Sequence, residues 1–320
     1  MNTPSDLRAR LLALYDALHQ HFGHESHWWP IISATPQFEI LVGAVLVQQT
    51  RWETVEAAIV RLRDAGLLAP AALAAADTAQ LAALLRPCAF HTQKAPGLQA
   101  ICRYILDHYD GDISAMLAQE RARVRNELLA LPRIGPETAD TIMLYAGDHP
   151  VFVVDAYARR LFARLDLAPG FDFARARYDE VQELIERALL PWPTTDHRPP
   201  TTDEGQTTKD DRPTTNDQRP TTNDDRHPSS FIVHRSSFTS PRHPFTSSPH
   251  LDGSLRHFLW DLHALIIEEC IHHCLATNPR QDQPGARRTF VDPRKCAAHC
   301  VNCQGCPLRD MCAYYHMRSD

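Results

Sequence analysis

The stretch LPRIGPETAD, from Leu131 to Asp140, decides the predicted fold. Apolar residues at helical spacing precede and follow it, so it joins two predicted helices. Pro136 suits the first position of the second helix, and Gly135 permits a tight turn before it. Two helices joined so closely point backbone N–H groups outward, which is a geometry that binds phosphate without reading sequence. An ordinary helix–turn–helix corner is an equally weighted alternative.

The rest of residues 1–192 has the pattern of an all-α protein. Apolar residues from Leu7 to Leu18 recur every three or four positions, and Phe38–Val47 has the composition of a buried helix. No alternating strand pattern repeats, and the apolar run Val151–Val154 is too short to define a sheet. We therefore predict an all-α fold for residues 1–192.

A change of composition divides the chain. Residues 193–253 are rich in Pro, Thr, Ser, Asp, Asn and Arg, with a short repeated Pro-Thr-Thr-Asn-Asp unit, and are predicted to be a disordered, low-complexity insert. An apolar helical pattern resumes at Leu255 and runs to about Cys274. The folded parts are therefore predicted to be 1–192 and 254–320, packed together across the insert.

Overall charge and hydropathy limit the class of protein. The chain has 320 residues, 43% of them hydrophobic, and a formal net charge of −6 at pH 7. An acidic total disfavours nucleic-acid binding by the whole surface, so any such binding needs a local site. No segment approaches the ~20 apolar residues that span a membrane, and no signal-peptide pattern opens the chain. We expect a cytoplasmic monomer without membrane contact, and association with the nucleoid follows only from the family resemblance given below.

Asp155 stands 18 residues after Glu137, immediately before a predicted helix. An aspartate at this place is usually an N-cap, and a cap also fixes the carboxylate as a catalytic group requires. Arg159, Arg160 and Arg164 follow at spacings that permit a basic face toward phosphates, or equally a solvated surface.

The cysteines give the sharpest pattern. Five of the nine lie between Cys296 and Cys312, which indicates a metal site more than disulfides. Four of them follow the spacing C-x6-C-x2-C-x5-C, namely Cys296, Cys303, Cys306 and Cys312. Spacing alone leaves structural zinc and an iron–sulfur centre open, and Cys300 lies where it could compete as a ligand. Cys270 and Cys274 are predicted to be core thiols.

The hairpin, Asp155 and the cysteine spacing together resemble the endonuclease III superfamily of helix-hairpin-helix DNA glycosylases, over roughly residues 5–190 and 255–315. The resemblance implies a two-part helical glycosylase fold with a C-terminal iron–sulfur loop. It also implies a [4Fe–4S] cluster on the four cysteines, Asp155 as a catalytic carboxylate, and duplex DNA with damaged bases as the partner. Residues 46–50 look like the family's loop whose glutamine fills the space left by a flipped base, and Gln48 is the position carried over. The hairpin residues carried over as DNA contacts are Arg133, Ile134 and Gly135.

Two positions depart from the family's bifunctional members. The lysine that forms a Schiff base there is Glu137 here, and a carboxylate cannot form an imine. The strand-cleaving lyase reaction is therefore expected to be missing, with water as the nucleophile. Arg133 stands where the family usually has glycine, and at positive φ an arginine costs on the order of 1 kcal/mol.

Glu137 in the hairpin and the run Trp28-Trp29-Pro30 are similar to the endonuclease III-related 3-methyladenine glycosylases. Without that resemblance the tryptophans are more simply core residues. With it, Trp28, Trp29 and Trp52 become walls of a pocket for a cationic base, and Glu137 becomes a second candidate catalytic residue that adds a negative field near that pocket. We therefore predict a monofunctional glycosylase for alkylated purines. A glycosylase for another damaged base and a non-catalytic DNA-structure binder are the alternatives.

Overall fold

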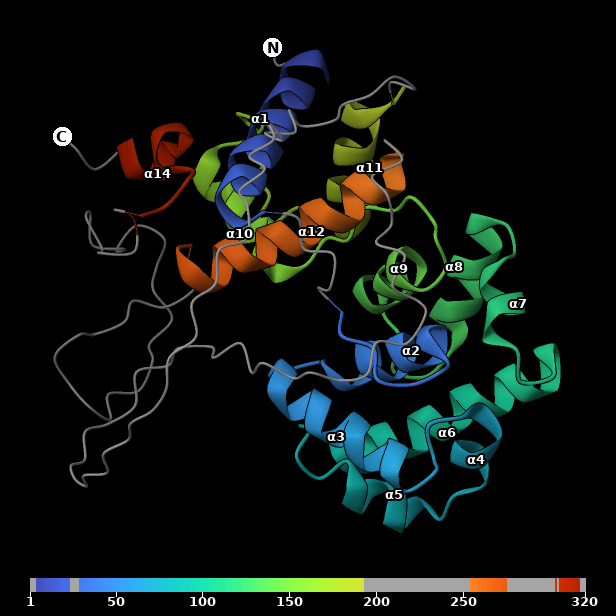
Figure 1. Ribbon diagram of the computed structural model, residues 1–320. Coiled ribbons are helices and arrows are strands. Elements are labelled where there is room, and N and C mark those ends of the chain that lie inside the picture. The colour runs from blue at the N-terminus through green and yellow to red at the C-terminus, as the bar shows by residue number, and fades with distance from the viewer. Residues whose placement is uncertain (1–3, 24–28, 193–253, 275–302, 304, 317–320) are drawn as a thin grey trace, which may run out of the picture. The chain divides into compact units, whose positions relative to one another are not determined.

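The computed structural model describes residues 4–23, 29–192, 254–274, 303 and 305–316, which all belong to one compact unit of the chain (Figure 1). Within these ranges every regular element is helical and no strand occurs, so the predicted all-α class is confirmed. None of the described helices has the length and apolarity needed to cross a membrane. Trp28, Cys296, Cys300 and the predicted insert 193–253 lie outside the described residues.

The helices follow one another along the whole described chain. Their bounds are α1 Pro4–Phe22, α2 Pro36–Leu46, α3 Trp52–Asp64, α4 Pro70–Ala75, α5 Thr78–Leu84, α6 His91–Tyr109, α7 Ile113–Leu117, α8 Arg121–Ala130, α9 Pro136–Tyr145, α10 Ala156–Leu165, α11 Tyr178–Leu189, α12 Leu255–His272 and α14 Ala313–His316, with the 3-10 turn η2 at Arg309–Met311.

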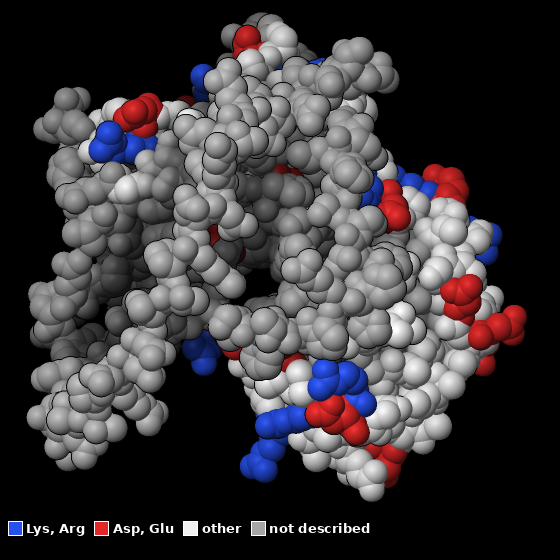
Figure 2. All heavy atoms as spheres, in the orientation of Figure 1, with Lys and Arg blue, Asp and Glu red and all other residues white. Residues whose placement is uncertain are grey.

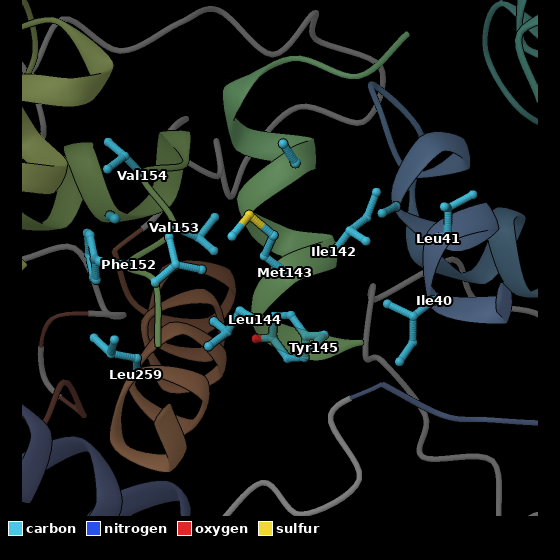
Figure 3. Packing of buried hydrophobic residues seen from close by; sticks show 14 of the residues in the cluster. Ile40, Leu41, Ile142, Met143, Leu144, Tyr145, Phe152, Val153, Val154 and Leu259 are labelled. Atoms are coloured by element: carbon cyan, nitrogen blue, oxygen red, sulfur yellow. The ribbon is translucent and has the colours of Figure 1, made fainter. Parts of the chain in front are cut away.

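Apolar spacing explains where each helix lies. In α1, Leu7, Leu11 and Leu18 share one buried face, which packs against α11 and α12. Helix α2 is apolar on nearly all sides and is buried against α3, α6, α7 and α9. Helix α9 contacts both α2 and α12, and in Figure 3 Ile142 points toward α2 while Leu144 points toward α12. The second helix of the predicted hairpin is therefore a central element of the core.

A buried ion pair fixes α9 against its neighbours. Asp140 is fully buried, and its oxygens accept hydrogen bonds from Arg125 of α8 at 2.8 Å and from Gln182 of α11 at 2.7 Å. A buried carboxylate needs such donors to offset the loss of water. On the surface, Figure 2 shows acidic and basic side chains interspersed over the described part of the face in view.

Candidate active site

The hairpin joins α8 to α9 through residues 131–135. Arg133 has φ +67°, so the arginine that stands in place of the family's glycine occupies a left-handed position. Gly135 has φ −97° and ψ 179°, an extended conformation open to any residue, so the left-handed turn is made at Arg133. A Cβ at Gly135 would meet no atom within 4 Å, which leaves the backbone approachable there. The first-turn N–H groups of α9 have no acceptors within the helix and remain available to an anion.

Gln48 lies in the turn between α2 and α3, and its amide points into the protein. Its Nε2 donates to the backbone oxygen of Arg133 at 2.7 Å and to the hydroxyl of Thr138 at 3.0 Å. The next residue, Gln49, is exposed and has φ +54°. The predicted position therefore supports the hairpin, and its neighbour is the glutamine that reaches the surface. Because the two glutamines are adjacent, the sequence alone does not show which side chain binds the hairpin and which reaches the surface.

Lys94 of α6 donates hydrogen bonds to the same turn between α2 and α3. It is fully buried, and its Nζ donates to the backbone oxygens of Leu46 and Gln48 at 2.8 Å and to the hydroxyl of Thr50 at 3.2 Å. Desolvation by burial lowers the pKa of Lys94. Sequence reasoning missed this residue, because a lysine within an apolar helix pattern does not reveal its acceptors.

Asp155 is the N-cap of α10, as predicted. Its Oδ1 accepts a hydrogen bond of 2.7 Å from the N–H of Ala158, and the residue is 5% exposed. The other oxygen, Oδ2, lies 3.6 Å from Nε2 of His263, which belongs to α12. On the far side of that imidazole, Nδ1 lies 2.6 Å from the hydroxyl of Tyr145, the last residue of α9. Sequence reasoning did not find His263 or Tyr145.

Glu137 lies in the exposed first turn of α9. Its pKa is raised, first because the surrounding protein desolvates the carboxylate and second because Asp155 repels its charge, while His263 and Arg159 act in the opposite direction. The structure therefore brings the two predicted carboxylates within electrostatic reach of each other.

Two of the predicted tryptophans form an aromatic row with Tyr145. The ring centroids of Trp29 and Trp52 are 5.1 Å apart in an edge-to-face arrangement, and those of Trp29 and Tyr145 are 5.5 Å apart. Trp29 also lies against α2, where a Cβ on Gly43 would come within 2.8 Å of the indole ring. Both tryptophans are half-buried, and the buried indole nitrogen of Trp29 has no hydrogen-bond partner among the described residues. The row leads from Trp52 to the tyrosine that contacts His263.

The arginines after Asp155 serve a different purpose from the predicted basic face. Arg159 donates to the backbone oxygen of Ala176 at 2.8 Å, and Arg160 donates to that of Cys274 at 2.8 Å. Arg164 donates to the Sγ atom of Cys274 at 3.1 Å. Their guanidinium groups therefore join α10 to other segments of the fold, a role that neither the basic face nor the solvated surface considered from the sequence includes.

Three of the four predicted cluster ligands are described, namely Cys303, Cys306 and Cys312. The Sγ atom of Cys306 lies 3.0 Å from a carboxylate oxygen of Glu269, a fully buried residue whose pKa is raised to about 8, chiefly by burial. Among the described residues, no group of three or more His, Cys, Asp or Glu side chains is arranged to hold a metal ion. The iron–sulfur loop is therefore a prediction that these side chains do not test.

Cys270 is a buried core thiol as predicted, and Cys274 packs, partly buried, against the core two residues beyond the end of α12. Arg164, which donates to the Cys274 sulfur at 3.1 Å, also accepts a contact of 3.7 Å from the Cys312 thiol on its backbone oxygen. One residue of α10 therefore contacts both thiols, although 38 positions separate them in the sequence.

Comparison with known proteins agrees with this geometry. The family described as HhH-GPD superfamily base excision DNA repair protein matches residues 42–189. A putative DNA repair glycosylase of Methanocaldococcus jannaschii is 38% identical over 178 residues, which cover 55% of this chain and 77% of the relative. A solved non-covalent endonuclease III–DNA complex superimposes with a TM-score of 0.58 at 17% identity, covering 100% of this chain and 99% of the other.

A solved 3-methyladenine DNA glycosylase of H. pylori is 29% identical and superimposes with a TM-score of 0.48, covering 57% of this chain and 81% of the other. The family match and the Methanocaldococcus jannaschii relative show that the chain belongs to the HhH-GPD superfamily of base excision DNA repair proteins, as a helix-hairpin-helix glycosylase of the endonuclease III type.

Proposed function

We propose that this protein hydrolyses the N-glycosidic bond of N-methylated purines in duplex DNA, without cleaving the strand. One observation carries the proposal: a row of aromatic rings from Trp52 through Trp29 leads to Tyr145, which contacts the histidine beside Asp155. Electron-rich ring faces favour a flipped cationic base, and Asp155 is a fixed anion at the end of that row.

The chemistry follows from the charge of the substrate. A purine methylated at N3 or N7 carries positive charge, so its glycosidic bond breaks with less help from a general acid than that of a neutral base. Asp155 stabilises the oxocarbenium-like sugar and accepts a proton from the water that attacks C1′, while the bonding electron pair leaves with the base. Glu137 offers no amine to replace that water, so no imine to the sugar forms.

In this proposal the hairpin binds the DNA backbone. The backbone near Arg133 and Gly135 and the N-terminus of α9 receive a phosphate. Ile134 is 6% exposed and takes part through its backbone only, because its side chain belongs to the core. Gln49 replaces Gln48 as the side chain that fills the space left by the flipped base, because the Gln48 amide already binds the hairpin.

We also propose that the chain carries a [4Fe–4S] cluster. Soft thiolate ligands suit such a centre, and Cys303, Cys306 and Cys312 would supply three of them. The spacing assigns the fourth place to Cys296, and Cys274, whose sulfur accepts from Arg164, is an alternative ligand to be tested. No step of the proposed reaction uses the cluster.

A glycosylase for another damaged base is the second candidate, because relatives named endonuclease III include that of Thermotoga maritima, which is 29% identical over 157 residues. The test uses duplex DNA bearing radiolabelled N-methylated purines and a duplex bearing thymine glycol, with chromatography of the released base and borohydride trapping beside it. We expect released 3-methyladenine, intact strands and no trapped adduct. A trapped adduct would overturn the monofunctional assignment, and release of thymine glycol alone would favour the second candidate.

Asp155→Asn is the matched test of the site. Asparagine still caps a helix, so the fold is expected to survive while base release falls by about 10²- to 10⁴-fold, the usual contribution of a catalytic acid or base. Asp77→Asn is the control, since Asp77 also caps a helix, by accepting from Gln80 at 2.9 Å, and is exposed. Near-normal turnover by Asp155→Asn would remove Asp155 from the mechanism.

A further inference from the structure

We infer that His263 is a positioning residue for Asp155: it presents an Nε2 proton to the carboxylate while Tyr145 binds the opposite ring nitrogen. The inference rests on the proposed function, in which Asp155 is the catalytic carboxylate. It concerns how a residue on α12, 108 positions further along the chain, keeps that carboxylate oriented.

The two oxygens of Asp155 face different partners. Oδ1 accepts the capping hydrogen bond from Ala158 at 2.7 Å, which leaves Oδ2 as the oxygen that faces His263 Nε2 at 3.6 Å. The side chains of His263 and Asp155 are only 6% and 7% exposed. Nε2 is buried and has no other hydrogen-bond partner among the described residues. A buried polar nitrogen left without a partner is costly, so its orientation toward a carboxylate is significant.

Tyr145 and Asp155 together determine where the imidazole carries its proton. Its hydroxyl lies 2.6 Å from Nδ1 of His263 and 3.5 Å from the backbone oxygen of Trp260, which can only accept. When the hydroxyl donates to Nδ1, the neutral imidazole carries its proton on Nε2. When the hydroxyl turns to Trp260, Nδ1 donates to the tyrosine oxygen, and protonation of Nε2 gives the imidazolium. A bare Nε2 would instead place a lone pair against the carboxylate, which is repulsive.

Asp155 therefore meets an N–H group in both favourable protonation states of His263. The Ala158 N–H and the His263 Nε2–H, one on each oxygen, fix the rotation of the carboxyl group. A separation of 3.6 Å exceeds a hydrogen bond, so the interaction in this DNA-free state is electrostatic. Catalytic hydrogen bonds are often long in the free enzyme and shorten when substrate binds.

Three variants of the full chain separate this role from simple packing. His263→Met keeps the volume and removes the donor, whereas His263→Gln retains an N–H group near the place of Nε2. Tyr145→Phe keeps the ring that contacts Trp29 and Trp260 and removes only the hydroxyl. The measurement is the single-turnover rate constant for base release from radiolabelled methylated duplex DNA, together with the Kd for that duplex and the melting temperature.

We expect His263→Met to slow base release by about 10- to 100-fold, the worth of a hydrogen bond to a charged group, with the Kd little changed. His263→Gln should recover most of the lost rate, and Tyr145→Phe should lose several-fold, because both tautomers then become available. NMR of ¹⁵N-labelled histidine should show a protonated Nε2 in the wild type, assigned by the signal that His263→Gln removes.

Other outcomes would overturn the inference. Wild-type rates in His263→Met, or equal losses in the Met and Gln variants with normal DNA binding, would show that the donor is not what matters. If His263→Met fails to fold, Tyr145→Phe becomes the deciding test of the inference. An unchanged rate constant for base release in Tyr145→Phe would reject the role of the hydroxyl. Retained base release by Asp155→Asn would instead reject the proposed function, so the two failures are distinguishable.

Discussion

The side-chain amide of Gln48 donates a hydrogen bond of 2.7 Å to the backbone oxygen of Arg133, the left-handed residue of the hairpin. The two residues are 85 positions apart, so this bond joins the turn after α2 to the start of α9. Lys94 binds the same turn from α6. The turn and the hairpin are therefore one hydrogen-bonded unit, and a change in either is felt by the other.

Replacement of Gln48 should weaken the fold. Gln48→Ala removes the donor to Arg133 and Thr138, and we expect the free energy of unfolding to fall by about 1–3 kcal/mol, as for two hydrogen bonds. Urea denaturation measures the loss. Gln49→Ala is the matched control: its side chain is exposed, so stability should stay unchanged while binding to a damaged duplex weakens. Equal stability of both variants would contradict this division of roles.

Gly97 and Arg133 should be energetically coupled. A Cβ at Gly97 of α6 would lie 2.7 Å from Cγ of Arg133, so we expect Gly97→Ala to destabilise the protein by about 1–3 kcal/mol through overpacking. In an Arg133→Gly background that clash is absent, and alanine should then be favoured over glycine within the helix. Chemical denaturation of the four proteins in a double-mutant cycle gives the coupling. Strictly additive effects would show that the close approach does not determine the cost.

The charge of Glu137 should reduce stability at neutral pH. Its pKa is raised in the fold by desolvation and by Asp155, so ionisation favours the unfolded chain. The free energy of unfolding therefore falls as the pH rises from the ordinary glutamate pKa, about 4.3, through the raised value. Glu137→Gln should be more stable than the wild type at pH 7, by less than about 1 kcal/mol for this exposed group, and equal to it below about pH 4.

The measurement for Glu137→Gln is the melting temperature at both pH values. Glu183→Gln serves as control, because Glu183 is an exposed carboxylate 3.8 Å from Arg187 and gains nothing from neutralisation. A gain for Glu137→Gln that is the same at both pH values would exclude the electrostatic explanation.

Loss of the visible absorption of the cluster in cysteine-to-serine variants should identify the cluster ligands. Protein purified without oxygen is expected to be yellow-brown, with broad absorption around ~400 nm. Serine at Cys303, Cys306 or Cys312 should abolish that absorption, and so should serine at only one of Cys274 and Cys296. Cys88→Ala is the control, because Cys88 is a buried thiol of the core. Colourless protein with stoichiometric zinc would refute the cluster.

Local rules predicted much of this site. The hairpin between two helices and the cap at Asp155 each depend on residues a few positions apart, and both are confirmed. The direction of the Gln48 side chain could not be predicted in this way, because its acceptors lie in the hairpin.

His263 and Tyr145 were missed for a related reason. They are 118 positions apart, and each fits an apolar helix pattern when considered alone. The arginines after Asp155 likewise bind acceptors in distant segments, Cys274 among them, so their spacing on α10 resembled a surface pattern.

Helix α12 follows the predicted insert in the chain, and this order has a consequence for biosynthesis. A nascent polypeptide that has emerged only to residue 192 contains the hairpin and the Asp155 cap, but it lacks His263 and the apolar face of α12 that contacts α1 and α10. Contacts of such long sequence separation form late and slowly. On the ribosome, α1 and α10 should therefore wait for α12, and the Asp155 carboxylate should meet its imidazole only after the segment beyond the insert has been made.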